Sequence, residues 1–242
     1  MKKKYTFEEF IDIIKTLRSE NGCPWDREQT HTSLKPCMTE EAAELLAAIR
    51  IYDTTGNFEN MREELGDILL QVIMHSQIAK EEGLFSIDEV ITEISEKMIR
   101  RHPHVFGDVK ADTAEEVLSN WDDIKKKEKE NISWATSPLR EIPIELPSLA
   151  RATKVLKKQD KLYGNVPDCK ETISKLKETV SQMEIALSGS ETDKKMLEKN
   201  YTEALLLMSN IAMRNKIQAE QLFTDKIEEI IEKYEPKSGI FP

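Results

Sequence analysis

Hydrophobic residues recur every three to four positions along most of the chain, which is the period of an amphipathic α-helix. In the first half this pattern predicts five helices, separated by turns that contain Gly, Pro or Asp. Their expected ranges are residues 6–18, 33–52, about 58–82, 86–102, and from about 113 onward. No segment of this half shows the strict alternation of a β-strand, so we expect an all-α domain, a helical bundle.

The second half repeats this plan after a segment rich in proline. "SPLREIPIELPS", residues 137–148, holds three prolines in twelve positions and predicts a linker. Four further helical segments are expected, at residues 149–162, 167–187, 193–214 and 223–235. We therefore predict two tandem helical units, residues 1–134 and 149–242, joined by a Pro-rich linker at 135–148.

Composition narrows the function classes. The chain has 242 residues, of which 33% are charged and 39% hydrophobic, a profile typical of a helical globular protein with a core. Its net charge of −10 argues against binding to nucleic acid or to an anionic membrane. The three cysteines have neither a disulfide nor a zinc spacing, and no apolar run is long enough to span a membrane. A cytoplasmic setting is expected.

The helix at 33–52 carries three carboxylates on a single turn, at Glu40, Glu41 and Glu44. On a helical wheel, Glu41 and Glu44 lie beside the apolar stripe expected to face the core, whereas Glu40 turns outward. The next helix repeats this arrangement: Glu64 and Asp67 lie beside its apolar stripe and Glu63 turns outward. Each helix therefore presents one inward pair of acids.

An antiparallel hairpin brings the two acid pairs to the same level. An acid pair on a single helix is more often a solvated face, but two pairs at one level beside apolar residues favour a site. Four unpaired carboxylates at the border of a core are unfavourable by several kcal/mol per ion. A hard divalent cation, which prefers oxygen ligands, is the expected neutralising partner.

Four sequence blocks then indicate a family. They occur in order between about residues 6 and 134: "CPWDREQTHTSLKPCMTEEAAELLAAI", "REELGDILLQVIMHSQIAKEEGLFSIDEV", "EKMIRRHPHVFGD" and "WDDIKKKEK". Together they resemble the MazG family of nucleoside triphosphate pyrophosphohydrolases, in the all-α NTP pyrophosphatase group. The resemblance implies a metal motif EExxE followed by ExxD, with Mg²⁺, or Mn²⁺ in its place, held by Glu41, Glu44, Glu64 and Asp67. These are the four acids that the helical wheel places inward.

The implied reaction is hydrolysis of a nucleoside triphosphate at the α-phosphorus to the monophosphate and pyrophosphate, in nucleotide-pool housecleaning. Two alternatives remain open: a narrower dUTP or dCTP pyrophosphatase, and a helical regulatory protein that has lost catalysis. Glu40 and Glu63 are candidates for orienting or deprotonating the attacking water, although helix capping or a solvated surface also explains them.

The resemblance also implies residues that bind the substrate. It places Lys97 and Trp121 at the nucleotide, with Arg100, Arg101 and Lys125 as phosphate partners. Complementing the helix C-terminal dipole is the alternative for the two arginines, and a core anchor is the alternative for Trp121. Trp25 is a candidate for the base pocket.

Two further expectations concern assembly and the second half. Leu70 lies on the otherwise polar side of its helix, and the family assembles as dimers, so a homodimer is expected. "LPSLARATKVLKKQDKLYG", residues 146–164, resembles the opening of the second domain of longer MazG proteins. The acid positions there would be Glu178, Ser181, Asn200 and Glu203, which keeps only two carboxylates. We therefore expect a degenerate second domain that serves as a scaffold or dimerisation module.

Overall fold

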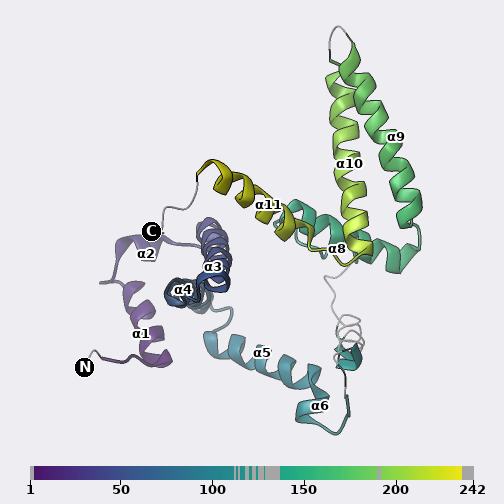
Figure 1. The fold of residues 1–242 in the computed structure, drawn as a ribbon. Coiled ribbons are helices and arrows are strands. Elements are labelled where there is room, and N and C mark those ends of the chain that lie inside the picture. The colour runs from purple at the N-terminus through teal and green to yellow at the C-terminus, as the bar shows by residue number, and fades with distance from the viewer. Residues whose placement is uncertain are drawn as a thin grey trace. The chain divides into compact units, whose positions relative to one another are not determined.

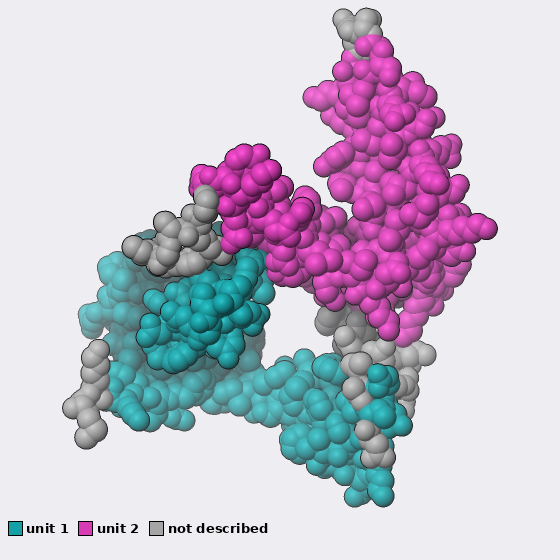
Figure 2. All heavy atoms as spheres, in the orientation of Figure 1, with its two compact units in different colours: residues 1–128 teal, residues 129–242 magenta. Residues whose placement is uncertain are grey.

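The computed structural model describes residues 3–111, 113, 115–117, 120–121, 124, 128, 137–189 and 192–235. Within these residues the regular structure is helical and contains no strand, which confirms the all-α prediction. The chain divides into two compact units, residues 1–128 and 129–242, coloured separately in Figure 2.

Unit 1 contains six helices with bounds given by the structure. They are α1 (Phe7–Leu17), α2 (Pro24–Glu28), α3 (Lys35–Thr55), α4 (Glu59–Glu81), α5 (Ile87–Arg101) and α6 (Pro103–Phe106). Capping boxes begin two of them: Thr6 pairs with Glu9 before α1, and Ser86 pairs with Glu89 before α5. The hydrophobic pattern does not predict the short helices α2 and α6, because each begins at a proline, which by itself indicates a helix break.

The helices α3 and α4 pair as an antiparallel hairpin in unit 1 (Figure 1). A core cluster of buried side chains forms beside this hairpin, and α1 packs against α4 there. Its members are Ile14, Leu34, Ile73, Met74 and Ile78. Leu70 is half-buried and packs against this cluster, so packing within its own unit accounts for its apolar side chain, and the expected oligomer contact stays a prediction.

Part of the apolar stripe that the helical wheel turns toward the core is exposed in the α3/α4 hairpin. Leu46 is 61% exposed and Leu65 is 51% exposed, and Ile49 and Leu69 are also exposed in the single chain. In contrast Ala48 and Glu64 are buried. Around the acid motifs the hairpin therefore buries Ala48 and Glu64 and leaves larger apolar side chains outside, whereas farther along α4 the larger residues Ile73, Met74 and Ile78 form the core.

Unit 2 contains α8 (Ser148–Tyr163), α9 (Cys169–Ser188), α10 (Lys194–Arg214) and α11 (Ala219–Tyr234). The helices α9 and α10 form a long antiparallel hairpin, and α8 packs against both α10 and α11 (Figure 1). All four helices lie where the hydrophobic pattern predicts them, with α11 beginning four residues early. Over the described part of the chain, no helix combines the length and apolarity needed to cross a membrane.

Candidate metal centre and substrate site

Three carboxylates converge between α3 and α4. One ligand oxygen from each of Glu41, Glu64 and Asp67 lies within 4.8 Å of the others. Glu64 and Asp67 share a face of α4 because residues three apart are neighbours on a helix, and Glu41 approaches from α3. Glu64 is buried and the other two are half-buried. The hairpin thus gathers three of the four acids that the wheel placed inward.

The electrostatics of this cluster favour a cation. Burial raises the pKa of the Glu41 carboxyl, and the nearby charges of Asp67 and Glu44 raise it further. Burial also raises the pKa of Glu64, with Glu44 and Asp67 as the next contributors. Like charges held this close disfavour one another's ionised form, and a divalent cation relieves that repulsion. An all-oxygen carboxylate set also has the ligand chemistry that Mg²⁺ prefers, so the residues present fit this ion.

The other three acids of the two motifs are exposed. Glu44 is outside the group of three, yet its charge acts on both Glu41 and Glu64, so it lies at the edge of the cluster. Glu40 and Glu63 are exposed, in agreement with their outward positions on the wheel. Glu63 also contributes to the raised pKa of Glu64, which places its charge near the cluster.

A second group of predicted residues gathers at the C-terminal end of α5. Arg100 and Arg101 both form ion pairs with Glu128, and Lys97 lies one turn earlier on the same helix. The Trp121 ring lies 5.8 Å from the His102 ring, and its buried Nε1 has no hydrogen-bond partner among the described residues. Lys125 lies outside the described residues. Among the described residues, no hydrogen bond or ion pair joins this basic group to the carboxylate cluster.

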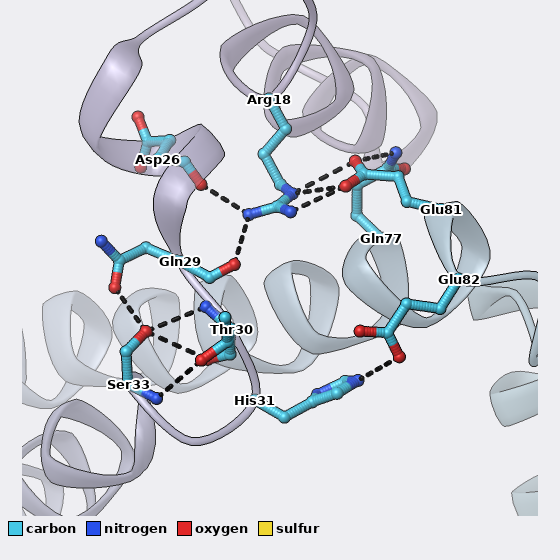
Figure 3. Close-up of polar contacts among 9 residues, drawn as sticks. All are labelled: Arg18, Asp26, Gln29, Thr30, His31, Ser33, Gln77, Glu81 and Glu82. Atoms are coloured by element: carbon cyan, nitrogen blue, oxygen red, sulfur yellow. Dashed lines mark hydrogen bonds and ion pairs between the residues drawn. The ribbon is translucent and has the colours of Figure 1, made fainter.

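The segment before α3, which carries Trp25, is fixed by one arginine (Figure 3). The buried Arg18 side chain donates from Nη1 to the carbonyl oxygens of Asp26 at 2.5 Å and Gln29 at 3.2 Å. Its Nε and Nη2 donate to the carboxylate of Glu81 on α4. Trp25 itself is exposed. The segment is therefore held against α4 while its tryptophan faces solvent.

A pair of histidines fixes the same segment farther along. His31 Nδ1 and His75 Nδ1 lie 2.8 Å apart, and His31 Nε2 lies 3.8 Å from Glu82 (Figure 3 shows the His31–Glu82 contact). Burial lowers the pKa of His75, and the neighbouring His31 lowers it further. The sequence carries no local signal of this contact, because the two histidines are 44 positions apart.

Comparison with known proteins bears on this geometry. Residues 29–106 match the MazG nucleotide pyrophosphohydrolase domain. The chain is 36% identical over 228 residues to a Thermotoga maritima protein named nucleoside triphosphate pyrophosphohydrolase/pyrophosphatase MazG, covering 94% of this chain and 84% of that one.

The chain belongs to the MazG nucleotide pyrophosphohydrolase family.

Two other relatives extend the comparison. An Escherichia coli K12 nucleoside triphosphate pyrophosphohydrolase is 36% identical over 214 residues, covering 88% of this chain and 80% of that protein. The uncharacterized protein YabN of Bacillus subtilis is 54% identical over 153 residues, which are 63% of this chain and 30% of that protein. The similarity to the Thermotoga maritima and Escherichia coli proteins therefore continues through most of unit 2.

The matched MazG domain contains the whole carboxylate cluster. It spans α3, α4, α5 and α6, and thus includes all six acids of the two motifs together with Lys97, Arg100 and Arg101. Trp25 and Trp121 lie outside the match. The six acids and the basic end of α5 therefore lie within the matched domain.

Proposed function

We propose that this protein is a Mg²⁺-dependent nucleoside triphosphate pyrophosphohydrolase. It hydrolyses ribo- or deoxyribonucleoside triphosphates at the α-phosphorus and releases the monophosphate and pyrophosphate, as in nucleotide-pool housecleaning in the cytoplasm. The observation that carries this proposal is the cluster of Glu41, Glu64 and Asp67, whose burial and mutual repulsion call for a cation within the matched MazG domain.

Glu41, Glu44, Glu64 and Asp67 would hold the metal ion, with Mn²⁺ as a substitute for Mg²⁺. Bound there, Mg²⁺ would offset negative charge on the phosphate oxygens and on the pyrophosphate leaving group. Glu44 completes the set because it is the exposed member at the edge of the cluster, where a ligand can enter from solvent.

The remaining predicted residues bind and orient the substrate in this proposal. Lys97, Arg100, Arg101 and Lys125 supply positive charge for the phosphates, and Trp121 and Trp25 contact the base. Glu40 and Glu63 are exposed carboxylates adjacent to the proposed ligands, and they orient the attacking water and accept its proton.

We also propose that the second unit, residues 149–242 after the linker at 135–148, is a degenerate MazG-like domain, and that residues 1–134 carry the chemistry. Among the described residues, the carboxylate group between α3 and α4 is the only set of three or more acids, histidines or cysteines close enough to hold a metal ion. The described part of unit 2 contains none.

The exposed stripe on α3 and α4 supports a homodimer. Leu46, Ile49, Leu65 and Leu69 are apolar side chains that a second copy of the chain would bury. Leu46→Glu is expected to shift the protein from dimer to monomer in sedimentation velocity. The matched change Glu20→Gln, at an exposed position away from α3 and α4, is expected to leave the dimer intact.

A substrate panel tests the proposed activity. Pyrophosphate release is measured from the common NTPs and dNTPs, with Mg²⁺ or with EDTA. Release from several nucleotides, only with the metal, is the expected result. Turnover of dUTP or dCTP alone would indicate the narrower pyrophosphatase, and no turnover of any nucleotide would favour a regulatory protein and contradict the proposal.

A further inference from the structure

One carboxylate holds both arginines at the end of α5. Glu128 Oε1 accepts from Arg100 Nε at 2.7 Å, and Glu128 Oε2 accepts from Arg101 Nε at 3.1 Å and from Arg101 Nη2 at 2.6 Å. The Glu128 and Arg101 side chains are largely buried, whereas the Arg100 side chain is 51% exposed. The bonds therefore fix the inner edges of two guanidinium groups.

The outer edge of the Arg100 guanidinium remains available. A guanidinium carries five N–H donors, and Glu128 takes only one from Arg100. The four N–H donors on the two Nη atoms of Arg100 make no other hydrogen bond within the described residues. Arg100 is thus held in place through Nε, and its side chain is half exposed. This is the arrangement that a planar fork needs in order to bind a phosphate.

The charge balance at this end of α5 stays positive. Two arginines and one glutamate leave one positive charge, and Lys97, one turn earlier on α5, adds another. The hydrogen bond from Arg101 lowers the pKa of Glu128 against the effect of burial, and Arg100 lowers it further. Glu128 is therefore ionised at neutral pH, and its pairing with the arginines persists while the group as a whole still attracts an anion.

We propose that Glu128 is a positioning residue that orients Arg100 and Arg101 for the polyphosphate chain of the substrate. This inference rests on the proposed function, because it takes a nucleoside triphosphate as the anion. An arginine whose rotamer is already fixed loses less conformational freedom when it binds phosphate, so the same contacts give tighter binding. Without Glu128, both arginines keep their charge but lose their orientation.

The first test measures binding without turnover. Calorimetric titration of the full chain with inorganic tripolyphosphate in Mg²⁺ buffer compares wild type, Glu128→Gln and Glu128→Asp. We expect Glu128→Gln to weaken binding about tenfold, the size of effect seen when the partner that orients a ligand is removed, and Glu128→Asp to restore part of it. Asp53→Asn, which removes one exposed charge from α3, is the matched control and should bind like wild type.

The second test separates positioning from general stability. Arg100→Ala is measured in the wild-type and Glu128→Gln backgrounds as a double-mutant cycle. If Glu128 positions Arg100, the loss of tripolyphosphate affinity from Arg100→Ala is smaller in the Glu128→Gln background. In turnover assays, Glu128→Gln should raise KM about tenfold while kcat changes less than about twofold, because the contact acts through binding.

Unchanged or tighter tripolyphosphate binding by Glu128→Gln, or equal effects of Arg100→Ala in both backgrounds, would overturn the inference. Wild-type protein that binds no tripolyphosphate would overturn it as well. Failure of the proposed function gives a different result: no nucleotide is hydrolysed by wild type, whereas the tripolyphosphate titrations still decide whether Glu128 positions the arginines.

Discussion

The two helical hairpins of this protein, α3/α4 in unit 1 and α9/α10 in unit 2, share a plan and differ in what they bury. Both second helices end in the same way. Leu84 N donates to Ala79 O around Gly83, which has φ 72°, and Ile217 N donates to Ala212 O around Lys216, which has φ 56°.

Four of the seven buried positions of α4 recur with the same spacing in α10. Gln71, Ile73, Met74 and Ser76 are buried in α4, and residues 207, 209, 210 and 212 are buried in α10. The paired residue numbers differ by 136, and the same difference aligns Asn200 with Glu64 and Glu203 with Asp67. Asn200 is half-buried and donates to the Met196 carbonyl of its own helix, whereas Glu203 is exposed.

The buried residues of α9, Thr172, Thr179 and Ala186, are seven positions apart. Leu34, Glu41 and Ala48, at the start of α3 and within it, have the same spacing; Leu34 and Ala48 are buried and Glu41 is half-buried. This register aligns Thr179 with Glu41 and residue 182, a glutamine, with Glu44. It lies one residue from the expected pairing with Glu178 and Ser181, both of which are exposed.

The α9/α10 hairpin folds without a buried cluster of carboxylates among its described residues. Where α3/α4 gathers acids, α9/α10 buries neutral polar groups, for example Asn210, which donates to Thr172 Oγ1 at 2.7 Å. A neutral hydrogen-bonded pair avoids the repulsion that raises the pKa values of Glu41 and Glu64. The acids of α3/α4 are thus unfavourable for folding alone, which supports a functional reason for them.

The largest effect is expected for Asp67→Asn, which removes a proposed metal ligand from the carboxylate cluster without changing the size of the side chain. Pyrophosphate release should fall by more than about a hundredfold, because a lost ligand weakens metal binding and the charge compensation of the reaction. Glu203→Gln is the matched change in unit 2 and should leave the rate within about twofold. A comparable loss of rate in Glu203→Gln would break the distinction between the hairpins.

Thr179→Glu tests the register by giving α9 the acid that α3 has. Thr179 is buried and donates to the Lys175 carbonyl, so an unpaired carboxylate there should lower the free energy of unfolding by about 3 kcal/mol. Urea denaturation followed by circular dichroism measures the change. Glu178→Ala, one residue earlier and exposed, should change it by less than about 0.5 kcal/mol. A larger loss of unfolding free energy in Glu178→Ala than in Thr179→Glu would instead support the register that aligns Glu178 with Glu41.

The two units also share an ion pair with its charges reversed. In unit 1, Arg18, which follows α1, pairs with Glu81 of α4. In unit 2, Asp160 of α8 pairs with Arg214 of α10. Arg214 also donates to the Val166 and Pro167 carbonyls, as Arg18 does to two backbone carbonyls at the end of α2. Each pair joins the first helix of a unit to the C-terminal end of the second hairpin helix. Both units therefore have an ion pair at this place, with the arginine at the end of the first helix in unit 1 and on the hairpin helix in unit 2.

Glu81→Gln sharpens this comparison through its pH dependence. Burial raises the pKa of Glu81, but hydrogen bonds from Arg18 and Gln77 outweigh it, and the net shift is downward from 4.5. A carboxyl whose pKa is lowered by folding stabilises the fold above its unfolded pKa and loses that contribution as the pH falls through the folded value.

Glu81→Gln should therefore lower the free energy of unfolding by about 1 kcal/mol at pH 7, a modest value because the Glu81 side chain is partly exposed. The difference from wild type should shrink as the pH falls below about 4.5. Urea denaturation at a series of pH values measures it. A difference that is constant with pH would mean that the ion pair contributes through packing rather than charge.

The smallest effects are expected at the two helix ends. Lys216 has a positive φ that side chains rarely adopt, so Lys216→Gly should raise the free energy of unfolding by about 0.5 kcal/mol. Gly83→Ala should lower it by about 1 kcal/mol; an added Cβ meets no atom within 4 Å, so backbone strain is the only cause. Thermal unfolding of both variants measures these changes, and shifts of the same sign would contradict the shared cap geometry.

Periodicity predicted the longer helices well because each one has a continuous apolar face and recognisable ends, such as Thr6 and Ser86. It also separated Glu41 from Glu40, since burial and direction on a helix follow from its geometry alone. It placed Leu46 and Leu65 on the stripe expected to face the core, but both are exposed. A wheel shows which residues share a face but not whether a neighbour in the same chain covers that face.

Contacts between distant segments could not be predicted from periodicity. The Arg18–Glu81 pair and the His31–His75 contact join residues 63 and 44 positions apart, and each residue alone is typical of a surface helix. Glu128 belongs to the same class: its sequence neighbourhood is a run of lysines and glutamates, and only the fold shows that it contacts Arg100 and Arg101.

Metal binding itself tests the central claim most directly, that α3/α4 holds the cation and α9/α10 does not. Titration with Mn²⁺, followed by electron paramagnetic resonance of the free ion, counts the sites and gives their affinity in wild type, Asp67→Asn and Glu203→Gln. The account predicts that binding is lost in Asp67→Asn and unchanged in Glu203→Gln. Retained binding in Asp67→Asn, or loss of binding in Glu203→Gln, would contradict it.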